Sequence, residues 1–115
     1  DTDFFISEIK RVLKPGGVLI ITTPNLLSLG RRLCYLLGIG IFMEASLTFP
    51  IKPQPAGHIR FFTKKLLVDL MKHNNFELEK YVSDTVNFPM FKCNFLAKIF
   101  PFLGHSIICK FKNIK

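Results

Sequence analysis

The alternation of apolar and polar positions predicts a helix, a tight turn and a buried strand near the start of the chain. Apolar side chains recur at helical spacing from 2 to 14, with Thr2 as the expected N-cap. The Pro-Gly-Gly turn at 15–17 ends this helix, because proline cannot continue it and glycine readily adopts a left-handed conformation. Residues 18–23 are apolar or β-branched throughout. That pattern is typical of an interior strand in a parallel sheet with helices on both faces.

The middle of the chain predicts a second helix followed by a long connection. Residues 26–37 carry leucines at helical spacing, with two arginines on another side. Residues 38–57 contain three prolines and show neither helical nor strand periodicity. Irregular connections of this length inside a compact domain are usually functional. We therefore expect 26–62 to form a lid or substrate loop region.

A third helix and an edge strand follow the long connection. Residues 64–74 have helical spacing, with Thr63 as the expected N-cap and an asparagine at 74 or 75 as the expected left-handed end. Residues 76–82 alternate and predict a half-buried strand near a sheet edge. The side chains expected on its inner face are Phe76, Leu78, Lys80 and Val82.

The last part of the chain is aromatic and basic. Residues 88–103 predict a short amphipathic helix, and 105–112 predicts a final strand. Five lysines and no acidic residue occur from 85 to 115. A packed helix with a solvated basic face is the simplest interpretation. Peripheral membrane contact through 88–103 is the main alternative, and a nucleic-acid partner is the least favoured.

Length and composition restrict the classes of protein. The chain has 115 residues, enough for one domain, and 49% of them are hydrophobic, which is too apolar for a disordered chain. Sixteen Lys and Arg against eight Asp and Glu give a net charge of +8. The most apolar stretch, 33–49, is shorter than a membrane-spanning helix requires.

Cysteine and histidine usage argues against disulfide and metal chemistry. The three cysteines form no C-x-x-C pair, and the three histidines stand far apart in the sequence. We expect reduced thiols and no metal site. The first residues are acidic, whereas a secretory signal peptide begins with a basic region. Together with the reduced thiols, this predicts a cytoplasmic protein.

Two runs of residues resemble a known enzyme family. The first run is 8–17, EIKRVLKPGG, followed by LIITTPN at 19–25. The second is GHIRFFT at 57–63, followed by a predicted helix and then NFE at 75–77. Both resemble the second half of class I S-adenosylmethionine-dependent methyltransferases, in the branch that includes the ubiquinone-pathway O-methyltransferases.

The resemblance implies an α/β fold, namely the C-terminal half of a doubly wound, Rossmann-like sheet. Its last strand would run antiparallel between strands 18–23 and 76–82. The family holds its cofactor mainly through a strand, a glycine-rich turn and an acidic residue in its first half. No such element occurs here, and we interpret Gly38 and Gly40 as a loop hinge. We therefore expect 1–115 to be a single partial domain that lacks its N-terminal half, has no cofactor-binding residue and is inactive alone.

Three residues are candidate site residues by this resemblance. Asn25 follows the strand at 18–23, at the sheet edge where ligands bind in open α/β sheets, and would contact substrate. His58 would bind the acceptor and act as the catalytic base toward its hydroxyl, and Arg60 would bind an acidic group. Each has a structural alternative: turn chemistry for Asn25, a loop-anchoring hydrogen bond for His58, and a solvated charge for Arg60.

Two functions remain open at this point. In the first, the parent enzyme transfers a methyl group from S-adenosylmethionine to a small-molecule or lipid-like acceptor by holding donor and acceptor in line. In the second, the chain is a non-catalytic, basic and Phe-rich module that binds membrane surfaces or anionic partners. Neither the acceptor nor the methylated atom can be named from these residues.

Overall fold

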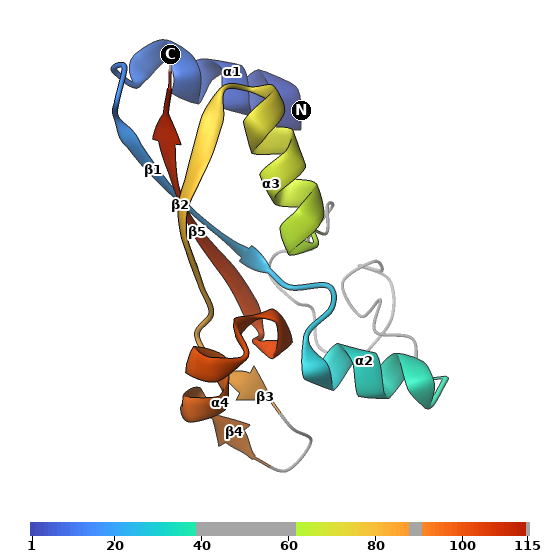
Figure 1. The fold of residues 1–115 in the computed structure, drawn as a ribbon. Coiled ribbons are helices and arrows are strands. Elements are labelled where there is room, and N and C mark those ends of the chain that lie inside the picture. Colours follow the sequence, from blue (N-terminus) through green and yellow to red (C-terminus); the bar gives the residue numbers. More distant parts are fainter. Residues whose placement is uncertain (39–61, 88–90, 115) are drawn as a thin grey trace, which may run out of the picture.

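The fold is known from a computed structural model that describes residues 1–38, 62–87 and 91–114. It is a mixed α/β fold (Figure 1). The elements in chain order are α1 (Thr2–Val12), β1 (Val18–Pro24), α2 (Leu29–Leu36), α3 (Lys64–His73), β2 (Phe76–Val82), β3 (Val86–Asn87), β4 (Lys92–Cys93), α4 (Asn94–Ile99), the 3-10 turn η1 (Pro101–Leu103) and β5 (Ser106–Asn113).

The main sheet has three strands in the order β1-β5-β2. β5 runs antiparallel to both neighbours, so β1 and β2 run parallel to each other on either side of it. Val18 pairs with Lys112 at one end of β1, and Pro24 pairs with Ser106 at the other. The predicted strand order, with the last strand inserted antiparallel between the other two, is confirmed. The two short strands β3 and β4 pair separately.

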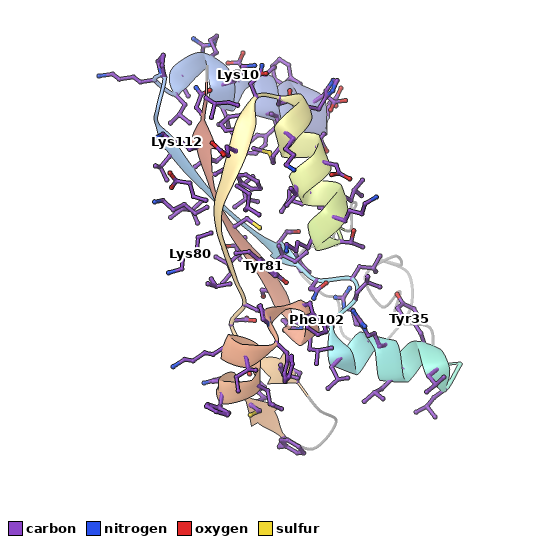
Figure 2. The ribbon with its side chains drawn as sticks, viewed as in Figure 1. Lys10, Tyr35, Lys80, Tyr81, Phe102 and Lys112 are labelled. Carbon is purple, nitrogen blue, oxygen red and sulfur yellow. The ribbon has the colours of Figure 1, made fainter. Side chains whose placement is uncertain are left out.

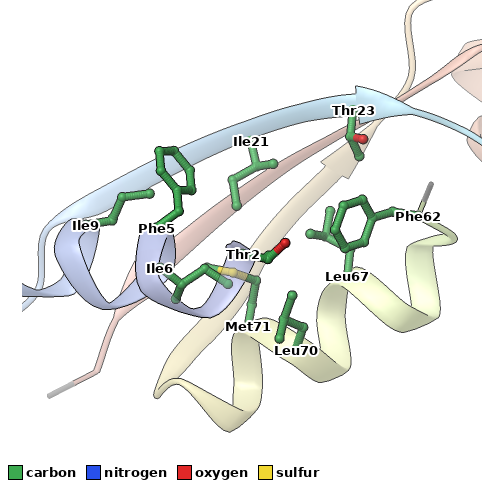
Figure 3. Close-up of a pocket in the computed structure, with 10 residues that line it drawn as sticks. All are labelled: Thr2, Phe5, Ile6, Ile9, Ile21, Thr23, Phe62, Leu67, Leu70 and Met71. Atoms are coloured by element: carbon green, nitrogen blue, oxygen red, sulfur yellow. The ribbon is translucent and has the colours of Figure 1, made fainter. Parts of the chain in front are cut away.

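The hydrophobic core lies on one face of this sheet, beneath α1 and α3 (Figures 1 and 3). Alternate residues of β5 face the core, because successive side chains of a strand point to opposite faces. Apolar side chains of the two helices and of β2 complete it. The fully buried members are Ile6, Leu67, Met71, Phe76, Ile107, Cys109 and Phe111.

β1 is covered on one face only within the described residues. Leu19 and Ile21 pack against the core, whereas Val18 and Ile20 point away from it and are 46% and 66% exposed. One face is left open because α1 and α3 pack on the same face of the sheet. Cover on both faces of 18–23 is expected of the longer parent, so for the second face it stays a prediction.

Local signals in the sequence set most helix ends. Gly16 has a φ of 75° in the turn that follows α1, and Asn75 has a φ of 61° after α3. The Thr63 hydroxyl accepts a hydrogen bond from the Leu66 N–H at 3.2 Å, as expected of an N-cap. These three predictions are confirmed.

Three predicted boundaries differ from the structure. The helix predicted over 26–37 begins only at Leu29, with Ser28 as its N-cap. α1 begins one residue early, because the Asp1 carboxylate accepts from the Asp3 N–H at 3.0 Å and so replaces Thr2 as the N-cap. The segment 88–103 is not one helix: its described part contains β4, α4 and η1. Pro101 divides α4 from η1, because proline has no N–H to continue the helical ladder.

β2 contains an irregularity that changes its inner face. Its register against β5 shifts between Leu78 and Lys80, so that Glu79 is an extra residue. As a result Tyr81 pairs with Cys109 and packs against the core, while Lys80 turns outward. The expected inward position of Lys80 and Val82 is therefore wrong beyond the bulge.

Candidate functional site

Asn25 lies at the carboxyl end of β1 and is 3% exposed. Its side-chain Nδ2 donates to the carbonyl oxygens of Phe102 at 3.0 Å and Gly104 at 2.9 Å. Its Oδ1 accepts from the Leu27 N–H at 3.0 Å. Both N–H groups of this amide are therefore bonded within the chain, and the side chain joins the end of β1 to η1 and its following turn.

The backbone of Asn25 adds further connections. Its N–H donates to the His105 carbonyl at 2.9 Å, and the next N–H, of Leu26, donates to the Phe62 carbonyl at 3.2 Å. Asn25 and Phe62 thereby form an isolated parallel bridge. The strand end, η1 and the residue before the α3 N-cap meet at this point. Direct contact between Asn25 and a substrate stays a prediction.

The other two candidate site residues, His58 and Arg60, lie outside the described residues, as does most of the proposed lid at 26–62. The described residue closest to them in sequence is Phe62, which pairs with Asn25. Their roles in substrate binding and, for His58, in catalysis stay predictions.

An apolar cavity of about 120 Å³ lies between α1, α3 and the second half of β1 (Figure 3). Phe5 and Ile9 enclose it from α1, and Ile21 and Thr23 from β1. Phe62 also lines it, and this residue connects the cavity to the Asn25 bridge. Since no charged side chain contributes to its lining, the cavity suits an apolar group and holds no acid or base.

Cys109 lies in the core and Tyr81 packs against it, and their surroundings keep both side chains neutral. Burial raises the pKa of Tyr81, and the neighbouring Cys109 raises it further. Burial also raises the pKa of the Cys109 thiol, although Lys64 lowers it in part. The Tyr81 hydroxyl donates to the Pro101 carbonyl at 3.0 Å, and the Lys64 ammonium lies 4.7 Å from the centre of its ring. Neither group is therefore an activated nucleophile or a base at neutral pH.

Asp84 is a connecting residue that the sequence patterns did not single out. Its carboxylate accepts hydrogen bonds from the Thr85 N–H at 2.7 Å, the Ser106 N–H at 3.1 Å and the Ser106 hydroxyl at 3.0 Å. Burial alone would raise its pKa, but these hydrogen bonds outweigh burial and lower the pKa. The Ser-Asp-Thr triplet at 83–85 is a local turn signal that could have indicated this role.

The glycine turn at 15–17 does not fit a cofactor-binding turn. The Gly16 N–H donates to the Asn113 carbonyl at 2.8 Å, and the Asn113 N–H donates back to the Gly17 carbonyl at 2.9 Å. The turn also leads from a helix into a strand, the reverse of a dinucleotide-binding turn. This turn therefore connects α1 to β1 and is held against the end of β5.

Within the described ranges, no three His, Cys, Asp or Glu side chains are grouped closely enough to hold a metal ion. None of the helices described in those ranges has the length and apolar character to cross a membrane.

Comparison with known proteins identifies no family for this chain. No protein-family model matches it, and no curated protein matches it. The methyltransferase resemblance therefore depends on the residues of the two motifs alone.

Proposed function

We propose that this chain is the C-terminal half of an S-adenosylmethionine-dependent methyltransferase that acts on a small or lipid-like acceptor. The observation that carries the proposal is the sheet: β5 lies antiparallel between β1 and β2, and α1 and α3 cover one face. This is the arrangement that the motif resemblance implies. It supports the proposal because the strand order does not follow from periodicity or composition.

The outer edge of β1 supports the idea of a missing half. In the described sheet β1 pairs with β5 alone, so its other edge has no strand partner. β1, of sequence VLIITTP, carries no charged residue, whereas β2 at the opposite edge has Glu77, Glu79 and Lys80 and a bulge. Charges and bulges protect sheet edges from further pairing. The β1 edge lacks this protection and suits a parallel strand from an N-terminal half.

The residues of this half would serve the acceptor rather than the cofactor. Asn25 holds the carboxyl end of β1 in place, and the apolar cavity beside it would accept an apolar part of the acceptor. His58 and Arg60 are proposed to contact the acceptor, with His58 as its base. S-adenosylmethionine supplies the reactive methyl group in this family, and we expect the N-terminal half to hold it.

Cofactor binding tests the proposal most directly. The coding sequence upstream of residue 1 should encode a strand followed by a glycine-rich turn, and the longer protein should bind S-adenosylmethionine in a calorimetric titration. The 115-residue chain alone should show no binding tighter than about 100 μM, which corresponds to roughly −5.5 kcal/mol. Tight binding by the short chain would contradict the proposal, as would an upstream sequence without the glycine turn.

The alternative function is a non-catalytic, basic and Phe-rich module for membrane surfaces or anionic partners. It is favoured by large apolar side chains that remain exposed around α4. The same titration distinguishes the two functions, since a binding module has no need of S-adenosylmethionine in the longer protein.

A further inference from the structure

The elements α2, β3, β4, α4 and η1 gather at the end of the sheet opposite to α1 and the α3 C-terminus (Figure 1), and we call this region the α2–α4 end. Its parts are in direct contact. Gly30 of α2 approaches β3 so closely that an added Cβ would lie 3.1 Å from the Asn87 carbonyl oxygen. The Arg32 guanidinium lies 5.9 Å from the ring centre of Phe102. Figure 2 shows Phe102 beside α2, with Lys10 and Lys112 at the far end.

α4 presents its apolar side to the outside. Ala97 is its buried residue, at 1% exposed, whereas Phe95 and Ile99 are 68% and 52% exposed. Phe95 and Ile99 are four residues apart and therefore share one helix face, with Lys98 beside them. A helix that only packs on a protein core has the opposite arrangement, with its large apolar residues inward.

Other apolar side chains of the α2–α4 end are also exposed. The large ones that are between 43% and 83% exposed are Leu36, Leu37, Phe91, Phe100 and Phe102. Large apolar side chains are also exposed on α1 and β1, so exposure alone does not distinguish the α2–α4 end. What distinguishes it is the charge of the residues that accompany them.

The charge of this end indicates the chemistry of its partner. The described residues of 26–38, 85–87 and 91–105 contain basic residues and no acidic residue. Arg32, Lys92 and Lys98 are exposed. The nearest acidic residue in sequence, Asp84, is occupied by its bonds to Thr85 and Ser106. An apolar surface with positive charge and no negative charge complements a layer that is anionic outside and apolar beneath.

We propose that the α2–α4 end docks on the surface of an anionic phospholipid bilayer. Phe95 and Ile99 enter the boundary between headgroups and acyl chains, and Lys92 and Lys98 contact lipid phosphates. This inference does not depend on the methyltransferase proposal, because its readout is binding to vesicles rather than methyl transfer or cofactor affinity.

The test is co-sedimentation of the 115-residue chain with vesicles. Vesicles of phosphatidylcholine with about one quarter phosphatidylglycerol should carry the protein down at low salt, and pure phosphatidylcholine vesicles should carry down far less. The double variant Phe95→Gln/Ile99→Gln should reduce partitioning about tenfold. Lys92→Gln/Lys98→Gln should reduce it by a similar factor and weaken its dependence on salt.

Matched control variants lie at the opposite end, on α1. Phe4 and Val12 of α1 are 67% and 68% exposed, which is comparable to the exposure of Phe95 and Ile99. The variant Phe4→Gln/Val12→Gln should therefore bind vesicles like the unchanged chain. Lys14→Gln/Lys72→Gln, which alters two exposed lysines of that far end, controls for net charge in the same way. Circular dichroism checks that each variant keeps its fold.

Three results would overturn the proposal. The first is no sedimentation with anionic vesicles, and the second is equal loss of binding in the control variants and the α4 variants. The third is that the chain binds a single-stranded oligonucleotide but no vesicles, and that this binding requires Lys92 and Lys98. That result would make nucleic acid the partner of the α2–α4 end.

Discussion

The covered face of the sheet and the α2–α4 end are held together by different forces. Beneath α1 and α3, fully buried apolar side chains such as Phe111, Phe76 and Met71 make the contacts. At the α2–α4 end the fully buried apolar residues are the smaller Val86 and Ala97. Side-chain bonds to backbone groups add to their packing: Asn25 bonds to two carbonyls, and Tyr81 to a third. Several large apolar residues of this region remain at the surface.

The largest difference should appear when a phenylalanine is removed from each region. Phe111→Ala deletes a fully buried ring from the central strand and should lower the free energy of unfolding by about 3–5 kcal/mol, enough to unfold a small domain. Phe95→Ala, at an exposed position, should change it by less than about 0.5 kcal/mol. Urea denaturation followed by circular dichroism measures both. Similar losses in the two variants would mean that α4 packs as a core helix.

Asn25→Ala tests the polar connections of the second region. The substitution leaves the carbonyls of Phe102 and Gly104 and the N–H of Leu27 without their partner. Buried groups left unpaired in this way cost about 1–3 kcal/mol, so we expect a loss of about 2 kcal/mol in the free energy of unfolding. Thermal and urea denaturation measure the loss. If the free energy of unfolding does not change, the hydrogen bonds of Asn25 do not stabilise the fold, and a substrate-binding role would be the better explanation of this residue.

The pH dependence of stability should report on Asp84. Its pKa in the folded chain is lowered from the usual value of 3.8, so the unfolded chain binds more protons in that range. The stability that Asp84 contributes to the folded chain is therefore fully present above pH 3.8, the usual pKa. It disappears as the pH falls through the lowered pKa of the folded chain. We expect the stability difference between the unchanged chain and Asp84→Asn to be below about 1 kcal/mol at pH 6, because the carboxylate is largely exposed. The difference should shrink toward zero in acid, and one that grew in acid would contradict this assignment.

The smallest effect is expected at Thr85. Its hydroxyl oxygen is buried and has no hydrogen-bond partner among the described residues. Thr85→Val keeps the shape of the side chain and removes that unpaired group. The free energy of unfolding should therefore stay the same or rise by up to about 1 kcal/mol. Differential scanning calorimetry resolves such a change, and a clear loss of stability would indicate a partner for the hydroxyl.

Sequence patterns correctly predicted features that depend on residues close together in the chain. The Thr63 cap and the left-handed Asn75 depend on residues within one turn of the chain. The position of β5 came from the motif resemblance. The bulge at Glu79 could not be predicted, since register depends on both strands. Nor could the partners of Asn25, which lie 77 and 79 residues away, because one sequence contains no record of contacts over that distance.

The central place of β5 also determines the order in which the molecule can assemble. β1 and β2 each pair with β5 and not with each other, and Val18 must find Lys112 across most of the chain. Contacts so distant in sequence form slowly, because a long loop must close before any pairing is gained. During synthesis on the ribosome, the edges of β1 and β2 that face β5 must therefore wait until residues 106–113 emerge. A stop codon before Ser106 would leave these two strands without the strand that joins them, and such a chain is a natural substrate for chaperones and proteases.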